Sequence, residues 1–159
     1  MAKVFLICGK ICSGKSTYSE KLRKEHGAVL LSVDEITLNL FGQHCGDEHD
    51  NYVERTEKYL FEKSLEILEV GVNVILDWGF WTKEERDFAK QFYNSHNIEY
   101  EFHYIDISDE VWNQRLAKRN AEVLENETSA YYIDENIAKK FSNIFCKPEA
   151  EEIDILISQ

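Results

Sequence analysis

The segment that most constrains this chain is a glycine-rich stretch close to its N-terminus. Residues Gly9–Thr17 read GKICSGKST, which satisfies the Walker A pattern G-x-x-x-x-G-K-[ST]. The apolar run Val4–Cys8 before it predicts a strand buried on both faces, and the spacing over Ser16–His26 predicts a helix. A strand, this loop and a helix in that order are typical of a phosphate-binding unit. The sequence therefore predicts an α/β protein with a site for a nucleoside triphosphate.

The residue types in this loop match the chemistry of a bound triphosphate. Gly9 and Gly14 let the backbone turn and approach an anion, so that successive N–H groups and the helix N-terminus converge on phosphate oxygens. Lys15 is expected to reach the β- and γ-phosphates, and the Ser16 hydroxyl to coordinate Mg²⁺. The predicted nucleotide-binding residues of the loop are Gly9, Lys10, Ile11, Cys12, Ser13, Gly14, Lys15, Ser16 and Thr17.

The rest of the chain alternates between strand and helix patterns. Further strands are expected at 28–32, 72–77, 98–107 and 153–157, and helices at 36–41, 51–70, 83–95, 109–124 and 133–144. Such alternation is typical of a parallel sheet covered on both faces by helices. The 159 residues are enough for one substantial core. We therefore predict a single domain over residues 1–159, with a five-stranded, mostly parallel sheet and helices on both faces.

The composition of the chain indicates its cellular compartment and the class of partner that it binds. Acids outnumber bases by 30 to 18, which gives a formal net charge of −12 and argues against a partner held by phosphate contacts, such as nucleic acid. No basic segment followed by a cleavage site opens the chain, and no apolar run approaches the ~18 residues of a membrane span. The few cysteines are scattered, which favours a reduced, cytoplasmic protein over a disulfide framework. They are Cys8, Cys12, Cys45 and Cys146.

Carboxylates come at the ends of three expected strands. Asp34, Asp77 and Asp106 each follow a buried apolar run. In open α/β sheets the ligand lies outside these strand ends, on the same side as the glycine-rich loop. Acids beside a phosphate site suit a bound metal ion or a proton transfer. An alternative for Asp77 is that it forms a turn before Trp78 and Gly79.

The polar loop Gln43–Asp50 contains residue types that bind metals, among them His44, Cys45 and His49. Zinc normally needs four ligands at recurrent spacing, and the sequence holds no second cluster. The favoured interpretation is a polar, flexible loop, which could still cover an acceptor site. The aromatic residues of Trp78–Trp81 could likewise stack on an acceptor ring or belong to the core.

Taken together, these segments resemble the small P-loop kinases with nucleoside-monophosphate-kinase architecture. Within them the chain is most similar to the AAA-domain ATP-binding proteins, relatives of zeta toxin, chloramphenicol phosphotransferase and the polynucleotide-kinase phosphotransferase domain. The stretches that carry the resemblance are Gly9–Thr17, Leu31–Glu35, Val74–Phe80 with Glu85 and Arg86, and Arg115–Asn120. The resemblance implies a P-loop NTPase fold and ATP as donor. It leaves the acceptor open, because the Gln43–Asp50 loop matches no pattern of these proteins.

The resemblance also implies roles for individual residues. Asp34 corresponds to the base that accepts the acceptor's hydroxyl proton, although an Asp there could also cap the helix beginning near Glu35. Asp77 resembles a Walker B acid that binds Mg²⁺ directly or through water. Arg115 and Arg119, one helical turn apart, resemble lid arginines within a lid of about 109–130, with a solvated helix face as the alternative. The expected catalytic residues are Lys15, Asp34, Arg115 and Arg119, with Arg115 also binding the nucleotide and with Ser16 and Asp77 at the metal.

Two further expectations concern less distinctive residues. Arg86 could pair with acids on its own helix, and the loop Phe145–Glu149 is expected to form the edge that holds the nucleotide base. The function that fits best is an ATP-dependent kinase, which moves the γ-phosphoryl group to a hydroxyl of a small molecule. The alternatives are a nucleic-acid 5′-end kinase and an ATP or GTP hydrolase with a regulatory role.

Overall fold

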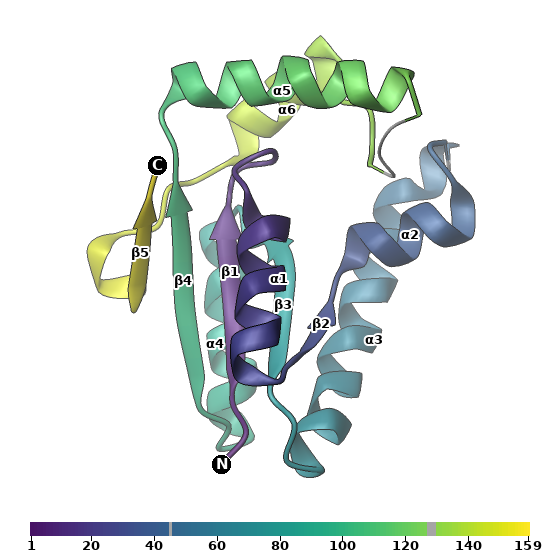
Figure 1. The fold of residues 1–159 in the computed structure, drawn as a ribbon. Coiled ribbons are helices and arrows are strands. Elements are labelled where there is room, and N and C mark those ends of the chain that lie inside the picture. The colour runs from purple at the N-terminus through teal and green to yellow at the C-terminus, as the bar shows by residue number, and fades with distance from the viewer. Residues whose placement is uncertain (45, 127–129) are drawn as a thin grey trace.

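A computed structural model describes residues 1–44, 46–126 and 130–159 of the chain (Figure 1). Its centre is a five-stranded sheet in the order β2-β3-β1-β4-β5, and every neighbouring pair is parallel. The strands are β1 (Val4–Gly9), β2 (Val29–Leu31), β3 (Val74–Gly79), β4 (Tyr100–Asp106) and β5 (Ile155–Ser158). The predicted five-stranded α/β sheet is confirmed, and it is parallel throughout rather than mostly so.

The helices also follow the predicted alternation. They are α1 (Lys15–His26), α2 (Val33–Phe41), α3 (His49–Glu69), α4 (Lys83–Ser95), α5 (Asp109–Leu124) and α6 (Glu135–Ile144), with short 3-10 helices η1 (Gly46–Glu48) and η2 (Ala150–Glu152). The sequence placed the start of α2 too late, at Ile36. The Ser32 side chain accepts a hydrogen bond from the Glu35 N–H at 3.3 Å, so the helix begins directly after Ser32. Within the described residues, none of the helices combines the length and the apolar character that crossing a membrane requires.

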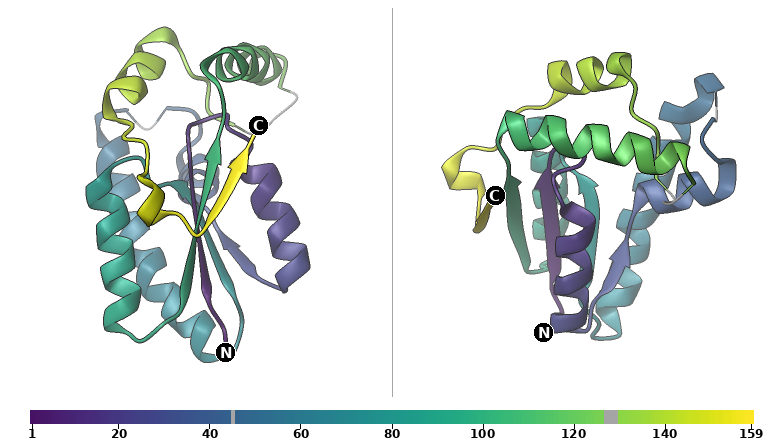
Figure 2. Two further views of the ribbon diagram at one scale, coloured as in Figure 1. Left: turned by 90° about the vertical axis from the view of Figure 1, so that its left-hand side faces the viewer. Right: turned by 45° about the horizontal axis from the view of Figure 1, so that its top comes forward.

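The central strand β1 separates two apolar cores. Val4, Leu6 and Cys8 pack on one face of the sheet with residues of α3 and α4, whereas Phe5 and Ile7 pack on the other with residues of α1, α5 and α6. Figure 2 shows α3 and α4 on one side of the sheet and α1 on the other, with α5 and α6 beyond the carboxyl ends of the strands. Side chains alternate between the faces of a strand, so an uninterrupted apolar run is expected only where both faces are covered. All five of these residues are 0% exposed, as the sequence predicted.

The carboxyl ends of β1 and β3 meet at one edge of the sheet, and the N-termini of α1 and α2 lie beside them. Helix α5 crosses above this edge. Helix α2 and the start of α3 lie at the β2 side of the sheet, away from its centre (Figure 1). In open parallel sheets this edge is where ligands bind. Residues of the glycine-rich loop, α5, α2 and α3 line one cleft at this edge.

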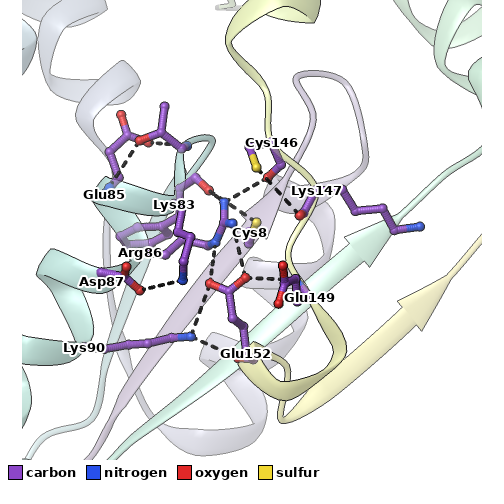
Figure 3. Close-up of polar contacts among 12 residues, drawn as sticks. Cys8, Lys83, Glu85, Arg86, Asp87, Lys90, Cys146, Lys147, Glu149 and Glu152 are labelled. Atoms are coloured by element: carbon purple, nitrogen blue, oxygen red, sulfur yellow. Dashed lines mark hydrogen bonds and ion pairs between the residues drawn. The ribbon is translucent and has the colours of Figure 1, made fainter.

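A buried ion pair joins α4 to the C-terminal segment (Figure 3). Arg86, which is 1% exposed, donates from Nε and Nη2 to the two carboxylate oxygens of Glu152 at 2.9 and 3.2 Å. Its Nη1 also donates to the carbonyl oxygens of Phe80 at 3.3 Å and Cys146 at 2.9 Å. The expectation that Arg86 pairs with acids on its own helix is wrong. It lies on the inward face of α4 with Ala89, where the exposed acids of that helix cannot reach.

Candidate nucleotide-binding site

The two glycines of the loop are required for different geometric reasons. A Cβ at Gly9 would come 2.7 Å from Ser13 Oγ and 3.2 Å from the Ile105 carbonyl oxygen, so the turn after β1 has no room for a side chain. Gly14 has a φ of 93°, in the left-handed region, and a Cβ there would also approach Arg115 Nη1 at 3.2 Å. The close backbone turn that the motif predicts is therefore present.

Lys15 begins α1 and lies between the loop and two acids. Its Nζ donates to the Lys10 carbonyl oxygen at 2.8 Å. Burial lowers the pKa of Lys15, while the negative charges of Asp77 and Asp34 act in the opposite direction. Burial likewise raises the pKa of Asp77, and the charge of Lys15 opposes that rise. Asp77 is only 8% exposed, so the loop's lysine has a buried carboxylate as its neighbour.

A cleft of about 1420 Å³ opens beside this loop. Ile11, Cys12, Gly14, Lys15, Ser16 and Thr17 contribute to its lining from the loop and the start of α1. Across from them, Asp34 lines the cleft from the first turn of α2. The interpretation of Asp34 as a helix cap is wrong, because Ser32 caps this helix and Asp34 is already its second residue. Asp34 is exposed and faces the same cleft as Lys15.

Helix α5 lies against the loop through three side chains. Arg115 Nη1 donates to the Ser13 carbonyl oxygen at 2.9 Å, and Arg119 Nη1 approaches Cys12 Sγ at 3.3 Å. About one helical turn before Arg115, Trp112 donates from Nε1 to the Ile11 carbonyl oxygen at 2.7 Å. Both arginines line the cleft, so the structure brings them to the loop rather than to a solvated face. Residues 127–129 of the expected lid lie outside the described residues.

Lys10 points away from this cleft. Its Nζ pairs with Asp109 at 2.8 Å and lies 5.2 Å from the ring centre of Trp112 and 5.9 Å from that of Phe145. These residues line a second cavity of about 430 Å³. The suggestion that Phe145–Glu149 holds the nucleotide base stays a prediction, and Phe145 does lie next to the loop.

Two of the three strand-end acids reach the cleft. Asp77 and Asp34 line it, whereas Asp106 lies at the end of β4, where it pairs with Lys147 Nζ at 2.9 Å and accepts a hydrogen bond from Tyr104. Strand β4 is on the far side of β1 from β3, which explains why its acid is separated from the other two.

The aromatic residues after β3 divide between core and cleft. Phe80 is 1% exposed and belongs to the core, whereas Trp78 and Trp81 line the cleft. The core interpretation therefore holds for Phe80. Of these three residues, the two tryptophans are the ones placed to contact a ligand in the cleft.

The Gln43–Asp50 loop is fixed against the segment that follows α5. Gln43 Nε2 donates to the Ala130 carbonyl oxygen at 2.6 Å, and Gln43 Oε1 accepts from the Tyr132 N–H at 3.1 Å. Cys45 lies outside the described residues. Within residues 1–44, 46–126 and 130–159, His, Cys, Asp and Glu side chains form no group of three or more suited to a metal ion. The loop continues into His49 and Asp50 of α3, which line the cleft.

Sequence reasoning missed Glu57, a half-buried residue of α3 that lines the cleft. Burial raises its pKa to about 7, and the negative charges of Glu85, Glu54 and Asp34 add to the effect. A signal was available, because Glu57 lies one helical turn after Val53 on the side of α3 that carries its apolar residues. The contact of Gln159 Oε1 with Arg115 Nη2 at 2.7 Å had no such signal, since it joins distant parts of the chain.

The sheet order, the glycine-rich loop and the lysine at the start of α1 define a P-loop nucleotide-binding protein with the fold of small kinases. More specifically, the chain belongs to the AAA domain family, whose model matches residues 4–136. Among curated protein sequences, no significant match is found.

Solved structures of several kinases share this fold. The sugar kinase of Janibacter sp. has a TM-score of 0.67 at 17% identity, with 99% of this chain and 86% of that chain covered. The APS kinase of Mycobacterium tuberculosis, solved with AMPPNP and APS, has a TM-score of 0.65 at 17% identity, with 99% and 88% covered. A chain of the Pnkp1/Rnl/Hen1 RNA repair complex has a TM-score of 0.68 at 23% identity, with 89% of this chain but only 43% of that chain covered. These likenesses establish the P-loop kinase fold.

Proposed function

We propose that this protein is an ATP-dependent kinase that transfers the γ-phosphoryl group to a hydroxyl of a small molecule. The observation that carries the proposal is the placement of Asp34 and Lys15 on one cleft, with a proton acceptor facing a phosphate-binding loop. The cleft, at about 1420 Å³, exceeds the roughly 300–1,000 Å³ of a single small-molecule pocket and has room for a donor and an acceptor together. A hydrolase needs no such acceptor space.

Each residue then has a role in an in-line transfer. The acceptor oxygen forms a bond to the γ-phosphorus, the bond from that phosphorus to the β–γ bridging oxygen breaks, and the nucleoside diphosphate leaves. Asp34 takes the proton of the acceptor hydroxyl. Lys15 neutralises charge on the β- and γ-phosphates, and Arg115 and Arg119 stabilise the charge of the transition state.

The residues present fit a magnesium ion at this site. Mg²⁺ prefers oxygen ligands and is usually held by few protein groups together with water and phosphates. The Ser16 hydroxyl is exposed at the first turn of α1, and the carboxylate of Asp77 lies on the same cleft beside Lys15. When bound, Mg²⁺ would neutralise charge on the β- and γ-phosphates; Ser16 and Asp77 would hold it.

Other observations support the identity of the donor, the acceptor and the setting. The AMPPNP in the related APS kinase structure supports an adenine nucleotide as donor. The acids on the cleft, together with the net charge of −12, support a small acceptor over a nucleic-acid end. The free thiols of Cys8, Cys12 and Cys146 support a cytoplasmic setting.

The test is a transfer assay with γ-labelled ATP and Mg²⁺, which offers sugars, nucleosides, amino alcohols and 5′-hydroxyl oligonucleotides separately at near-physiological salt. We expect label on a small molecule, and none with Lys15→Ala, whose ATP affinity should fall while its circular dichroism spectrum is unchanged. Label on the oligonucleotides alone would establish the nucleic-acid end kinase instead. Release of free phosphate at the same rate with and without every acceptor would establish a hydrolase.

A further inference from the structure

The two sides of the cleft carry opposite charges. We call the cleft-lining residues of the loop, α1 and α5 the donor wall, and those of α2, α3 and the segment 77–85 the acceptor wall. The described Lys and Arg side chains that line the cleft belong to the donor wall: Lys15, Lys21, Arg115 and Arg119. One acid of the donor wall, Glu122 of α5, lies with them. The acceptor wall contributes acids and, in the described part of the chain, no Lys or Arg: Asp34, Glu35, Asp50, Glu57, Asp77 and Glu85. The donor wall suits a polyanion, as a triphosphate requires, and the acceptor wall suits a cation.

Glu57 is a half-buried acid of the acceptor wall with other acids around it. The charges that act on it come from three elements, namely Glu85 at the start of α4, Glu54 on its own helix and Asp34 on α2, and all are negative. Together with burial they raise its pKa to about 7. Asp77 differs from Glu57, because the positive charge of Lys15 acts on it and opposes the effects of burial and of Asp34 on its pKa. A positively charged group bound here would relieve the repulsion and return the Glu57 carboxyl to its ionised form.

Aromatic rings line the same wall and are fixed in place. The Trp78 ring lies edge-on to Phe61 with centroids 5.4 Å apart, and the Trp81 ring lies edge-on to Phe141 at 4.7 Å. The Trp81 indole also packs over Gly79, where a Cβ would collide with it. The face of an indole attracts cations, and tryptophan does so best among the aromatic side chains. This observation is independent of the carboxylates and points to the same ligand chemistry.

We propose that the acceptor is a hydroxyl-bearing amine, such as an amino sugar or an amino alcohol, whose ammonium group is recognised by Glu57 and Glu85 beside Trp78. The inference rests on the proposed kinase function, because it assigns the substrate class of that same cleft. In this proposal, the residues that bind the acceptor differ from the residue that takes its proton. Glu57 and Glu85 bind the charged amine, while Asp34 is left to take the proton of the hydroxyl.

The experiment compares acceptors that differ only in the amine. Glucosamine is paired with N-acetylglucosamine, and a set of aminoglycosides and amino alcohols with their N-acetylated forms, in the γ-labelled ATP assay and by calorimetry on the AMPPNP-bound protein. We expect transfer to, or binding of, amines and at least about a tenfold loss on N-acetylation, which removes a charge-assisted contact. Binding at pH 6.5 should also release protons, seen as a heat that depends on the ionisation enthalpy of the buffer.

Matched variants locate the effect. Glu57→Gln should raise the KM for the amine about tenfold, or weaken its calorimetric affinity equally, and abolish the proton release. Glu62→Gln, an exposed residue further along α3 that does not line the cleft and whose charge is not among those that raise the pKa of Glu57, should leave both unchanged. Phosphorylation of the acetylated and free compounds with equal efficiency would refute the amine inference and leave the kinase function standing. Absence of binding and transfer for every amine refutes it too, and acceptor-independent phosphate release would refute the kinase function itself.

Discussion

The charged side chains of the donor wall and of the acceptor wall differ in the partners that they have within the protein before any ligand binds. On the donor wall, the cations already have partners in the protein: Lys15 donates to the Lys10 carbonyl oxygen at 2.8 Å and Arg115 to that of Ser13 at 2.9 Å. On the acceptor wall, Glu57 experiences only further negative charges. Hydrogen-bonded cations are preorganised for a triphosphate, which is the same in every enzyme of this type. The repulsion among the acids lowers the stability of the fold, and a complementary acceptor would offset this loss. We therefore expect the acceptor wall to determine specificity.

The largest expected effect separates chemistry from binding. Asp34→Asn keeps the size and the exposed position of the side chain but removes the proton acceptor. We expect the turnover number to fall by about 10²–10⁴-fold, the usual contribution of a general base, with little change in ATP affinity. Initial rates in the γ-labelled ATP assay, with calorimetric ATP binding as the control, measure both. A fully active variant would show that the acceptor wall holds only the substrate and performs no chemistry.

The second prediction concerns the support of the acceptor wall. Arg86→Met removes a guanidinium that bonds both oxygens of Glu152 and the Phe80 carbonyl oxygen, just before Trp81 enters the cleft. The Glu152 carboxylate then keeps the longer contact with Lys90 Nζ, at 3.7 Å, as its charge partner, and the Phe80 carbonyl oxygen loses its guanidinium donor. We therefore expect a loss of about 3 kcal/mol in the free energy of unfolding, the lower end of the range for breaking a buried pair. Urea unfolding followed by fluorescence measures it.

The exposed pair of Lys83 with Asp87 provides the matched control for this prediction, since its side chains are 55% and 57% exposed. Lys83→Met should leave the free energy of unfolding nearly unchanged, because a solvent-exposed ion pair contributes little. Equal effects of the two substitutions would mean that the Arg86–Glu152 pair does not hold the C-terminal segment to α4.

The third prediction tests the donor wall. Arg115→Ala and Arg119→Ala should each lower turnover about 10–100-fold while ATP affinity falls less, if the arginines act mainly on transition-state charge. Steady-state rates and calorimetry on the same preparations separate the two quantities. Lys118→Ala, an exposed residue of the same helix that does not line the cleft, is the control. An equal loss of affinity and turnover in the arginine variants would assign them to nucleotide binding alone.

The sequence predicted more of the donor wall than of the acceptor wall. The donor wall comes mostly from one continuous segment, so spacing alone predicted the positions of Gly9, Gly14 and Lys15 and the strand and helix around them. Arg115 and Arg119 were expected there only through the resemblance to P-loop kinases. The contact of Arg115 with Gln159 could not be expected, because no local pattern connects a helix with the residue that follows the final strand.

The acceptor wall is assembled from separate elements, which is why reasoning along the chain recovered little of it. Asp34 was expected from its place after a strand, but Glu57 and Glu85 come from two different helices. Their approach depends on how α3 and α4 pack on the sheet. The repulsion between them is a tertiary property. It appears in no spacing, and even the position of Glu57 beside the apolar stripe of α3 predicts burial rather than a neighbour.

The smallest effect is a change of stability with pH, and it tests the acceptor wall without any ligand. The folded-state pKa of Glu57 is raised to about 7 from a usual value of 4.5. Between these two values the folded protein binds more protons at this site than the unfolded chain does. Stability contributed by this group is therefore lost as pH rises from about 4.5 to 7 and does not return above it.

Glu57→Gln removes the ionisation, so the variant should be more stable than the natural protein above pH 7 by on the order of 1 kcal/mol, after allowance for solvent screening of a half-buried group. The difference should shrink toward pH 5, where the carboxyl is protonated in the fold. Urea unfolding of both proteins from pH 5 to 8 measures it, with Glu62→Gln, an exposed acid of the same helix that does not line the cleft, as the control. A stabilisation that is the same at pH 5 and pH 8 would trace to packing rather than to charge, and Glu57 would then give no evidence of a wall that awaits a cation. If Glu57→Gln is more stable at high pH and also binds the amine more weakly, then the Glu57 carboxylate lowers the stability of the fold and is needed to bind the acceptor.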